Sequence, residues 1–171
     1  DAQVTLDELA AAGIESTVVS GDRAGPVSAV AADLGLEWKA ELHPDAKLAH
    51  MEKLKSAGHH PLMVGDGIND GPALAAAHAS IAPGSASDVS QQAADAVFVG
   101  ERLMPVALAV VAAQRTMRVV RQNFGFAIAY NMLAIPLALA GLVTPLIAAI
   151  AMSISSLVVV ANSLRLARAA R

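Results

Sequence analysis

The fold of this chain is decided by the stretch Met63-Val64-Gly65-Asp66-Gly67-Ile68-Asn69-Asp70-Gly71-Pro72-Ala73-Leu74. The apolar run at residues 61–64 predicts a buried strand that stops at Gly65, and a new helix is expected to begin near Pro72. Open α/β sheets bind their ligands at the carboxyl ends of such strands. The oxygen-bearing side chains of the turn are Asp66, Asn69 and Asp70. Carboxylate and carboxamide oxygens suit Mg²⁺, so the stretch predicts a magnesium site; a polar surface loop is the alternative.

Residues 1–100 alternate between helical and extended patterns. Helices are expected at residues 6–12, with Thr5 as N-cap, and at 25–34, 44–57, 73–77 and 86–93. Strands are expected at residues 14–19, 37–42, 61–64, 79–82 and 96–99. Strands separated by helices pair in parallel through right-handed crossovers. This region is therefore predicted to be part of a doubly wound α/β domain.

Two further segments carry groups that could bind phosphate. Ser20-Gly21-Asp22 ends a predicted strand and offers a hydroxyl and backbone N–H groups, although Ser-Gly-Asp is also an ordinary turn. Lys47 lies in the first turn of a predicted helix that begins at Pro44. A single lysine on a helix is usually solvated, so neither segment establishes a phosphate site by itself.

Taken together, these segments resemble a known family. Gly65-Asp66-Gly67-Ile68-Asn69-Asp70-x-Pro72-Ala73-Leu74 resembles the hinge motif of P-type ATPases, which are members of the haloacid-dehalogenase-like superfamily. The order of strand serine, helix lysine and Gly-Asp-Gly-x-Asn-Asp is similar to the last three motifs of that superfamily. Gly71 stands where family members usually carry a larger residue, often alanine. The resemblance implies an α/β fold, a partial haloacid-dehalogenase-like (Rossmannoid) domain with a parallel sheet, followed by a two-helix transmembrane hairpin.

The resemblance also implies roles for single residues. Ser20 would hydrogen-bond the phosphoryl oxygens, Lys47 would neutralise the phosphate and its aspartyl partner, and Asp66 would coordinate Mg²⁺. The implied catalytic set is Ser20, Gly21, Asp22, Lys47, Asp66, Asn69 and Asp70. Within this set Ser20, Lys47 and Asn69 are expected to contact the bound phosphoryl group, and Asp66 and Asp70 are expected to bind Mg²⁺. Positioned cations are what phosphoryl transfer most needs.

The superfamily's first motif, an aspartate in an Asp-Lys-Thr-Gly-Thr-like segment, does not occur in this sequence. We therefore expect the chain to be the carboxyl-terminal part of a larger protein, which binds ATP through a nucleotide domain encoded elsewhere. By itself the chain is expected neither to form a phosphoenzyme nor to turn over ATP.

The composition excludes some classes of function. A net charge of −3 gives no argument for nucleic-acid binding, and the absence of cysteine excludes disulfides and thiolate metal sites in this sequence. No signal-peptide pattern opens the chain. The histidines His43, His50, His59, His60 and His78 show no convincing metal-ligand spacing, and His59-His60 is expected to be solvated.

Beyond residue 100 the character of the sequence changes. Residues 101–122 are predicted to form a connecting helix, with Arg115, Arg118 and Arg121 on one face. No Asp, Glu, Lys or Arg occurs between Gln122 and Leu164. Residues 123–142 and 145–164 are each about 20 residues long, enough to cross about 30 Å of hydrocarbon. Residues 123–171 are therefore predicted to be a transmembrane hairpin with a basic tail; a buried hairpin in a soluble core is the alternative.

Arginines flank both outer ends of the predicted hairpin, with Arg165, Arg168 and Arg171 at the carboxyl-terminal end. The positive-inside rule places these ends, together with the α/β domain, in the cytoplasm. We therefore expect a multi-pass protein of the plasma (inner) membrane.

Polar residues inside the predicted spans are candidates for a transport site. They are Tyr130, Asn131, Met152, Ser155 and Ser156. A methionine thioether suits Cu(I), although serine and asparagine often hold transmembrane helices together and a single methionine is usually packing. The pattern is similar to the last two membrane helices of copper(I)-transporting P-type ATPases. That resemblance implies a Cu(I) site made by Tyr130, Asn131, Met152 and Ser155, with Cys-Pro-Cys thiolates from an earlier helix.

Other metal specificities are expected to look different, because zinc and cadmium exporters of this class would carry a charged residue in these helices. Residues 143–149 and 158–166 are most similar to the subgroup linked to copper delivery for cbb3-type cytochrome oxidase assembly.

The functional expectation is the carboxyl-terminal part of an ATP-driven copper(I) or heavy-metal transporter. Its expected cofactors are Mg²⁺ and ATP, with Cu(I) as the transported ion. Its expected partners are the lipid bilayer, the other domains of the parent ATPase and a copper chaperone. The alternatives are a membrane-anchored haloacid-dehalogenase-like phosphatase and a non-catalytic membrane interaction module.

Overall fold

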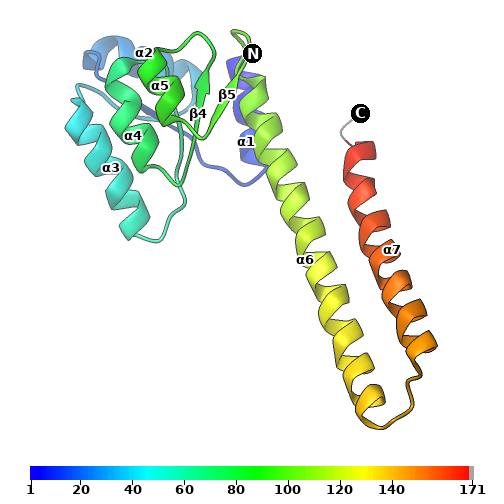
Figure 1. Cartoon of the computed structure of the whole chain (residues 1–171). Helices are drawn as coiled ribbons and strands as arrows, with labels where there is room; N and C mark the ends of the chain where they lie inside the picture. Colours follow the sequence, from blue (N-terminus) through cyan, green and yellow to red (C-terminus); the bar gives the residue numbers. More distant parts are fainter. Residues whose placement is uncertain (170–171) are drawn as a thin grey trace. The chain divides into compact units, whose positions relative to one another are not determined.

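The computed structural model describes residues 1–169, with side chains through residue 165. Arg171 and the side chain of Arg168, both predicted to flank the hairpin, lie outside the described residues. The chain forms two compact units, Asp1–Leu108 and Ala109–Arg171. Figure 1 shows helices grouped around short strands in the first unit and long helices in the second.

The first unit follows the predicted alternation of helices and strands. Its helices are α1 (Ala2–Ala11), α2 (Ala24–Leu34), α3 (Pro44–Ser56), the 3₁₀ turn η1 (Ile68–Asp70), α4 (Gly71–Ala76) and α5 (Asp88–Ala93). Its strands are β1 (Thr17–Val19), β2 (Glu37–Lys39), β3 (Leu62–Val64), β4 (Ala79–Pro83) and β5 (Ala96–Phe98). The α/β prediction is confirmed, although several strands are shorter than expected.

The prediction that Thr5 caps the first helix is wrong. Helix α1 already begins at Ala2, and Thr5 lies inside it as a buried residue. Its hydroxyl donates to the carbonyl of Asp1 at 2.9 Å, so the threonine satisfies its own polar group within the helix. A threonine side chain can bond either to a helix end or to a carbonyl one turn earlier, and the sequence alone does not separate these cases.

The strands pair in parallel, as predicted, but in two separate sheets. Strand β1 pairs with β2, and β3, β4 and β5 form a second sheet in that order. Within the described residues, β1 and β3 each pair along one edge only. Each of these strands therefore has one edge with no strand paired to it among the described residues.

The core of this unit lies beneath the Gly65–Asp70 turn. Met51 of α3, Met63 of β3, and Ala73 and Leu74 of α4 are buried against one another. Leu74 is only 1% exposed, and burying a side chain of this size contributes about 1.5–3 kcal/mol. The cluster joins β3, which precedes the turn, to α4, which follows it, and both pack against Met51 of α3, so the turn is held from both ends.

The second unit consists of most of α6 (Met104–Leu139) together with α7 (Pro145–Ala169). The predicted connecting helix and the first predicted span thus form one continuous helix. Gly141 has a φ of 74°, the left-handed conformation that glycine adopts without strain, and it lies in the turn between the helices. Pro145 opens α7, while the Thr144 hydroxyl accepts the Ile147 N–H at 3.3 Å.

Among the described residues, one helix is long and apolar enough to cross a membrane. It is α7, over Pro145–Arg165, with a mean hydropathy of 2.0. The other predicted span lies in the second half of α6, which ends at Leu139 and contains the polar pair Tyr130 and Asn131. Length and hydropathy therefore support one of the two predicted crossings, and the two-span topology stays a prediction.

Apolar side chains of α6 and α7 are exposed. Phe124, Leu139 and Leu157 are 66%, 84% and 67% exposed, respectively. The described residues therefore do not bury this region in a core, which counts against the alternative of a buried hairpin in a soluble protein.

Candidate functional site

A buried ion pair lies directly behind the Gly65–Asp70 turn. Lys47, in the first turn of α3, and Asp70, at the end of η1, are both only 8% exposed. The Lys47 ammonium donates to Asp70 Oδ1 at 2.7 Å, and the backbone N–H of Gly67 donates to Asp70 Oδ2 at 3.3 Å. Each carboxylate oxygen of Asp70 thus has a protein partner. The pair joins α3 to the turn and places a positive charge beside it.

Gly65 allows the turn to pass close to this pair. A Cβ at position 65 would lie 3.0 Å from Asp70 Cβ and 3.1 Å from Asp70 Oδ2. Neither neighbour can move freely, because Asp70 is held by Lys47. The glycine is therefore required for close approach of the backbone to the buried carboxylate.

Asp66 and Asn69 are exposed on the outer side of the same turn. Asp66 lines an open hollow of about 350 Å³ together with Ser85 and Glu101. The hollow lies beyond the carboxyl ends of β3, β4 and β5, where a parallel sheet normally binds its ligand.

Two serines that were not singled out from the sequence hold the backbone of this turn. Ser90 is completely buried, and its hydroxyl donates to the Gly67 carbonyl in a short hydrogen bond. Ser87 caps α5 by accepting the Ser90 N–H at 3.2 Å, and its own N–H donates to the Asp66 carbonyl at 3.1 Å. Ser-Asp at the start of the predicted helix was the available N-cap signal. The contact with the distant turn had no local signal.

The segment Ser20-Gly21-Asp22 follows β1. The Ser20 hydroxyl accepts the Asp22 N–H at 3.1 Å, and the Ser20 N–H donates to the Lys39 carbonyl at 2.9 Å. A Cβ on Gly21 would lie 3.3 Å from the Leu42 carbonyl oxygen. This segment therefore forms a compact turn at the carboxyl end of its own sheet.

The structure joins only some of the predicted site residues directly. Lys47 and Asp70 are in contact, whereas Ser20, Asp66 and Asn69 make no hydrogen bond to this pair among the described residues. No three His, Cys, Asp or Glu residues in the described part of the chain are grouped as a metal site. The side-chain oxygens of Asp66 and Asn69 are exposed and have no hydrogen-bond partner among the described residues, so they are available as metal ligands. They fit Mg²⁺, which commonly binds one or two protein carboxylates and completes its shell with phosphate and water.

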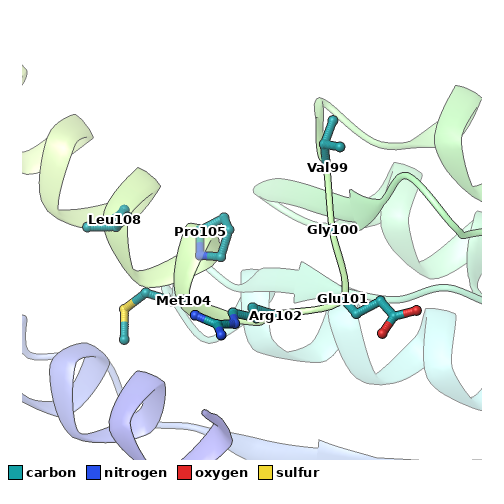
Figure 2. A pocket seen from close by; sticks show the side chains of 7 residues that line it. All are labelled: Val99, Gly100, Glu101, Arg102, Met104, Pro105 and Leu108. Carbon is teal, nitrogen blue, oxygen red and sulfur yellow. The ribbon is translucent and has the colours of Figure 1, made fainter.

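A second hollow, of about 560 Å³, lies where the chain passes from β5 into α6. Figure 2 shows Met104, Pro105 and Leu108 of α6 on one side, residues 99–101 on the other, and Arg102 between the two groups. Its walls are mainly apolar and it contains none of the predicted phosphoryl-binding residues. It is therefore distinct in chemistry from the hollow at Asp66.

Two polar side chains in the predicted spans form hydrogen bonds within their own helices. The Asn131 carboxamide donates to the Ala127 carbonyl at 2.8 Å, and the Ser156 hydroxyl donates to the Met152 carbonyl at 3.0 Å. Met152 is 66% exposed. Within the described residues no hydrogen bond joins Tyr130 or Asn131 to Met152 or Ser155.

The hydrogen bonds between α6 and α7 lie at the opposite end of the hairpin from its turn. The Asn162 carboxamide donates to the side-chain oxygens of Asn123, at 2.9 Å, and of Gln122, at 3.3 Å. Asn123 in turn donates to the Ser163 hydroxyl at 3.0 Å.

The chain is similar to known proteins along most of its length. Residues 1–78 match the family model for haloacid dehalogenase-like hydrolases. The chain is 53% identical over 162 residues to the nitrogen fixation protein FixI of Rhizobium leguminosarum bv. viciae, covering 94% of this chain and 21% of that protein. It is 45% identical over 164 residues to a copper-exporting P-type ATPase of Mycobacterium tuberculosis, covering 95% and 22% of the two chains.

A solved structure agrees with these sequence matches. A zinc-transporting PIB-type ATPase in its E2.Pi state is 34% identical and superposes with a TM-score of 0.87, covering 97% of this chain and 27% of that one.

The first part of the chain is a haloacid-dehalogenase-like α/β domain. The chain as a whole is homologous to the carboxyl-terminal region of the heavy-metal P-type ATPases, which are membrane enzymes. It spans about a fifth of the length of the curated relatives that it matches.

Proposed function

We propose that this chain is part of an ATP-driven heavy-metal transporter and that its transported ion is Cu(I). In this proposal residues 1–100 are the end of the phosphorylation domain, residues 101–122 connect it to the membrane, and residues 123–171 form a two-helix membrane hairpin. The observation that carries the proposal is the buried Lys47–Asp70 pair behind the exposed carboxylate of Asp66. That arrangement supplies both a fixed positive charge and free oxygen ligands at one turn.

The residues at this site would have separate roles in binding Mg²⁺ and the phosphoryl group. Asp66 would hold Mg²⁺, which neutralises charge on a bound phosphoryl group. Asn69, predicted from the sequence to contact the phosphoryl group, would replace Asp70 as the second Mg²⁺ ligand, because Lys47 and the Gly67 N–H already engage the Asp70 carboxylate. Asp70 would orient the Lys47 ammonium toward that group, because a carboxylate held by two donors keeps its partner in place. The Ser20 hydroxyl, at the carboxyl end of β1, would donate to a phosphoryl oxygen.

The phosphorylated aspartate would come from another part of the same protein. Strands β1 and β3 both have an open edge, and both end beside predicted phosphate-binding residues. A parallel strand inserted between them would join the two sheets and bring its own carboxyl end to the same place.

Copper(I) is favoured over zinc by the donors in the hairpin. The candidate ligands are Tyr130, Asn131, Met152 and Ser155, and none of them carries a charge. A thioether is a soft ligand that suits Cu(I), whereas Zn²⁺ prefers imidazole, thiolate and carboxylate. Both a copper-exporting and a zinc-transporting ATPase are among the similar proteins, so the choice of metal rests on these donors.

The catalytic assignment can be tested in the full-length protein by measuring Mg²⁺-dependent phosphoenzyme formation and ATP turnover. Asp66→Ala is expected to reduce turnover about a hundredfold or more, because it removes the charged ligand of the metal. Asp33→Ala, which removes an exposed carboxylate on α2, is the control. Unchanged turnover in Asp66→Ala would remove the central role of this residue.

The transport assignment needs a separate measurement. Met152→Leu keeps the size and apolar character of the side chain but removes the sulfur. Cu(I)-stimulated ATPase activity should fall while Mg²⁺-dependent phosphorylation by inorganic phosphate is kept. Wild-type stimulation by Cu(I) would reject the thioether ligand. A protein that hydrolyses a soluble phosphate ester in the presence of Mg²⁺ and shows no stimulation by Cu(I) would instead be the membrane-anchored phosphatase.

A further inference from the structure

Two histidine side chains lie against each other where two strands of the three-stranded sheet begin. His60 precedes β3 and His78 precedes β4, and these neighbouring strands run in parallel. The N–H groups of His78 and Ala79 both donate to the Pro61 carbonyl, at 3.0 and 3.2 Å. The backbone therefore holds the two histidine-bearing segments together.

The two imidazole rings are close and accessible. Their centroids are 4.4 Å apart and their planes are inclined by 44°. Both residues are exposed, and neither ring has a hydrogen-bond partner among the described residues. Each neutral ring thus keeps one nitrogen lone pair available to an outside ligand.

Imidazole is the commonest protein ligand for borderline transition metals. Metal–nitrogen bonds of about 2.0–2.1 Å place adjacent ligand nitrogens about 3 Å apart. Rings whose centroids are 4.4 Å apart can reach that spacing by rotation of exposed side chains, with no movement of the backbone. We propose that His60 and His78 form an open, two-imidazole binding site for a divalent transition-metal ion.

The chemistry of this site differs from that of the two sites already proposed. Mg²⁺ prefers oxygen ligands and should not compete for imidazole. Asp66 follows the carboxyl end of β3, whereas His60 precedes its amino end, so the two sites lie at opposite ends of the strands. With only two protein ligands, water must complete the coordination shell. Affinity should therefore be moderate and highest for Cu²⁺, followed by Ni²⁺ and Zn²⁺.

The test is Cu²⁺ titration of the purified protein in detergent micelles, with electron paramagnetic resonance to count coordinated nitrogens. The wild type should bind one Cu²⁺ with two imidazole nitrogens. His60→Gln and His78→Gln should each lose the two-nitrogen signal and weaken binding about tenfold or more, at least the size of losses seen when ligand-supporting residues are removed. His43→Gln, an exposed histidine at the start of α3, is the matched control.

A two-nitrogen signal that survives both substitutions overturns the proposal, as does an equal loss in His43→Gln. Zn²⁺ titration of the unmutated protein gives an independent readout that does not depend on how the variants fold. The imidazole NMR signals of His60 and His78 should shift together at the lowest Zn²⁺ concentrations. Earlier shifts of the other histidines would also overturn the assignment.

Discussion

The Lys47 ammonium and the Asp70 carboxylate form an ion pair at 2.7 Å, with both residues only 8% exposed. The pair connects α3 to the turn between β3 and α4, which are segments 23 residues apart in the sequence. Because water has little access to either charge, each depends on the other for its solvation. The pair therefore has a structural role as well as the phosphate-binding role proposed for Lys47.

Removal of either charge should destabilise the α/β unit. Lys47→Met or Asp70→Leu leaves the partner charge buried and unpaired, which typically costs about 3–5 kcal/mol. The double variant should lose much less than the sum of the single losses, because no unpaired charge remains. Chemical unfolding of the wild type, both single variants and the double variant measures this coupling. Additive losses would mean that the two residues act independently.

The close approach of the Gly65 backbone to Asp70 can be tested without removing the charge of Asp70 or Lys47. Gly65→Ala introduces a Cβ 3.0 Å from Asp70 Cβ, so the turn or the carboxylate must shift. We expect a loss of about 1–3 kcal/mol in the free energy of unfolding, the usual cost of overpacking. Gly25→Ala is the matched control, because a Cβ at this position in α2 meets no atom within 4 Å. It should be neutral or stabilising, and an equal loss at both positions would contradict the argument.

Substitution of Ser90 should raise the Mg²⁺ concentration that the full-length enzyme needs for phosphorylation, although Ser90 is not proposed as a metal ligand. Ser90→Ala removes one of the two donors to the Gly67 carbonyl, the other being the Asp70 N–H at 3.0 Å. Loss of this hydrogen bond should cost about 0.5–1.5 kcal/mol and loosen the backbone beside Asp66. In the full-length protein, the Mg²⁺ concentration for half-maximal phosphorylation should rise more than the ATP concentration for half-maximal turnover. Ser28→Ala, which removes an exposed helix hydroxyl bonded to Gly25, is the control. An equal rise in both requirements would indicate general destabilisation only.

Much of the architecture was predictable because its signals are local. Most helices and strands could be located from the spacing of apolar residues, from the apolar run before Gly65 and from the prolines that start helices. For example, α3 (Pro44–Ser56) was expected at residues 44–57. The division of the strands into two sheets was not predictable, because β-pairing depends on contacts between distant segments.

The candidate site was predictable in its residue types but not in its contacts. Gly65–Asp70 was predicted to be a magnesium site from its pattern of glycine, carboxylate and amide, and that assignment stays a prediction. The pairing of Asp70 with Lys47, which engages the carboxylate, is a tertiary contact. The buried hydrogen bond of Ser90 is another, since an isolated serine in a short helix has no sequence feature that distinguishes a buried donor from a solvated one.

His50 gives the α/β unit a pH dependence whose sign follows from its surroundings. Partial burial lowers the pKa of His50 below its usual value of 6.5, and the nearby Lys39 and Lys53 lower it further. Lys39 Nζ lies 3.2 Å from His50 Nδ1, a contact that the neutral ring can accept and the protonated ring cannot. Below about pH 6.5 the unfolded chain therefore binds a proton that the folded protein resists, and stability falls with decreasing pH.

This pH effect should disappear when the ring is replaced. The free energy of unfolding of the wild type should decrease from pH 7.5 to 5.5 by more than that of His50→Gln, and the two profiles should run parallel above about pH 6.5. Lys53→Gln should show an intermediate decrease, because it removes one of the two cations that disfavour the charged ring. Identical profiles for the wild type and His50→Gln would show that the surroundings of His50 do not affect its protonation.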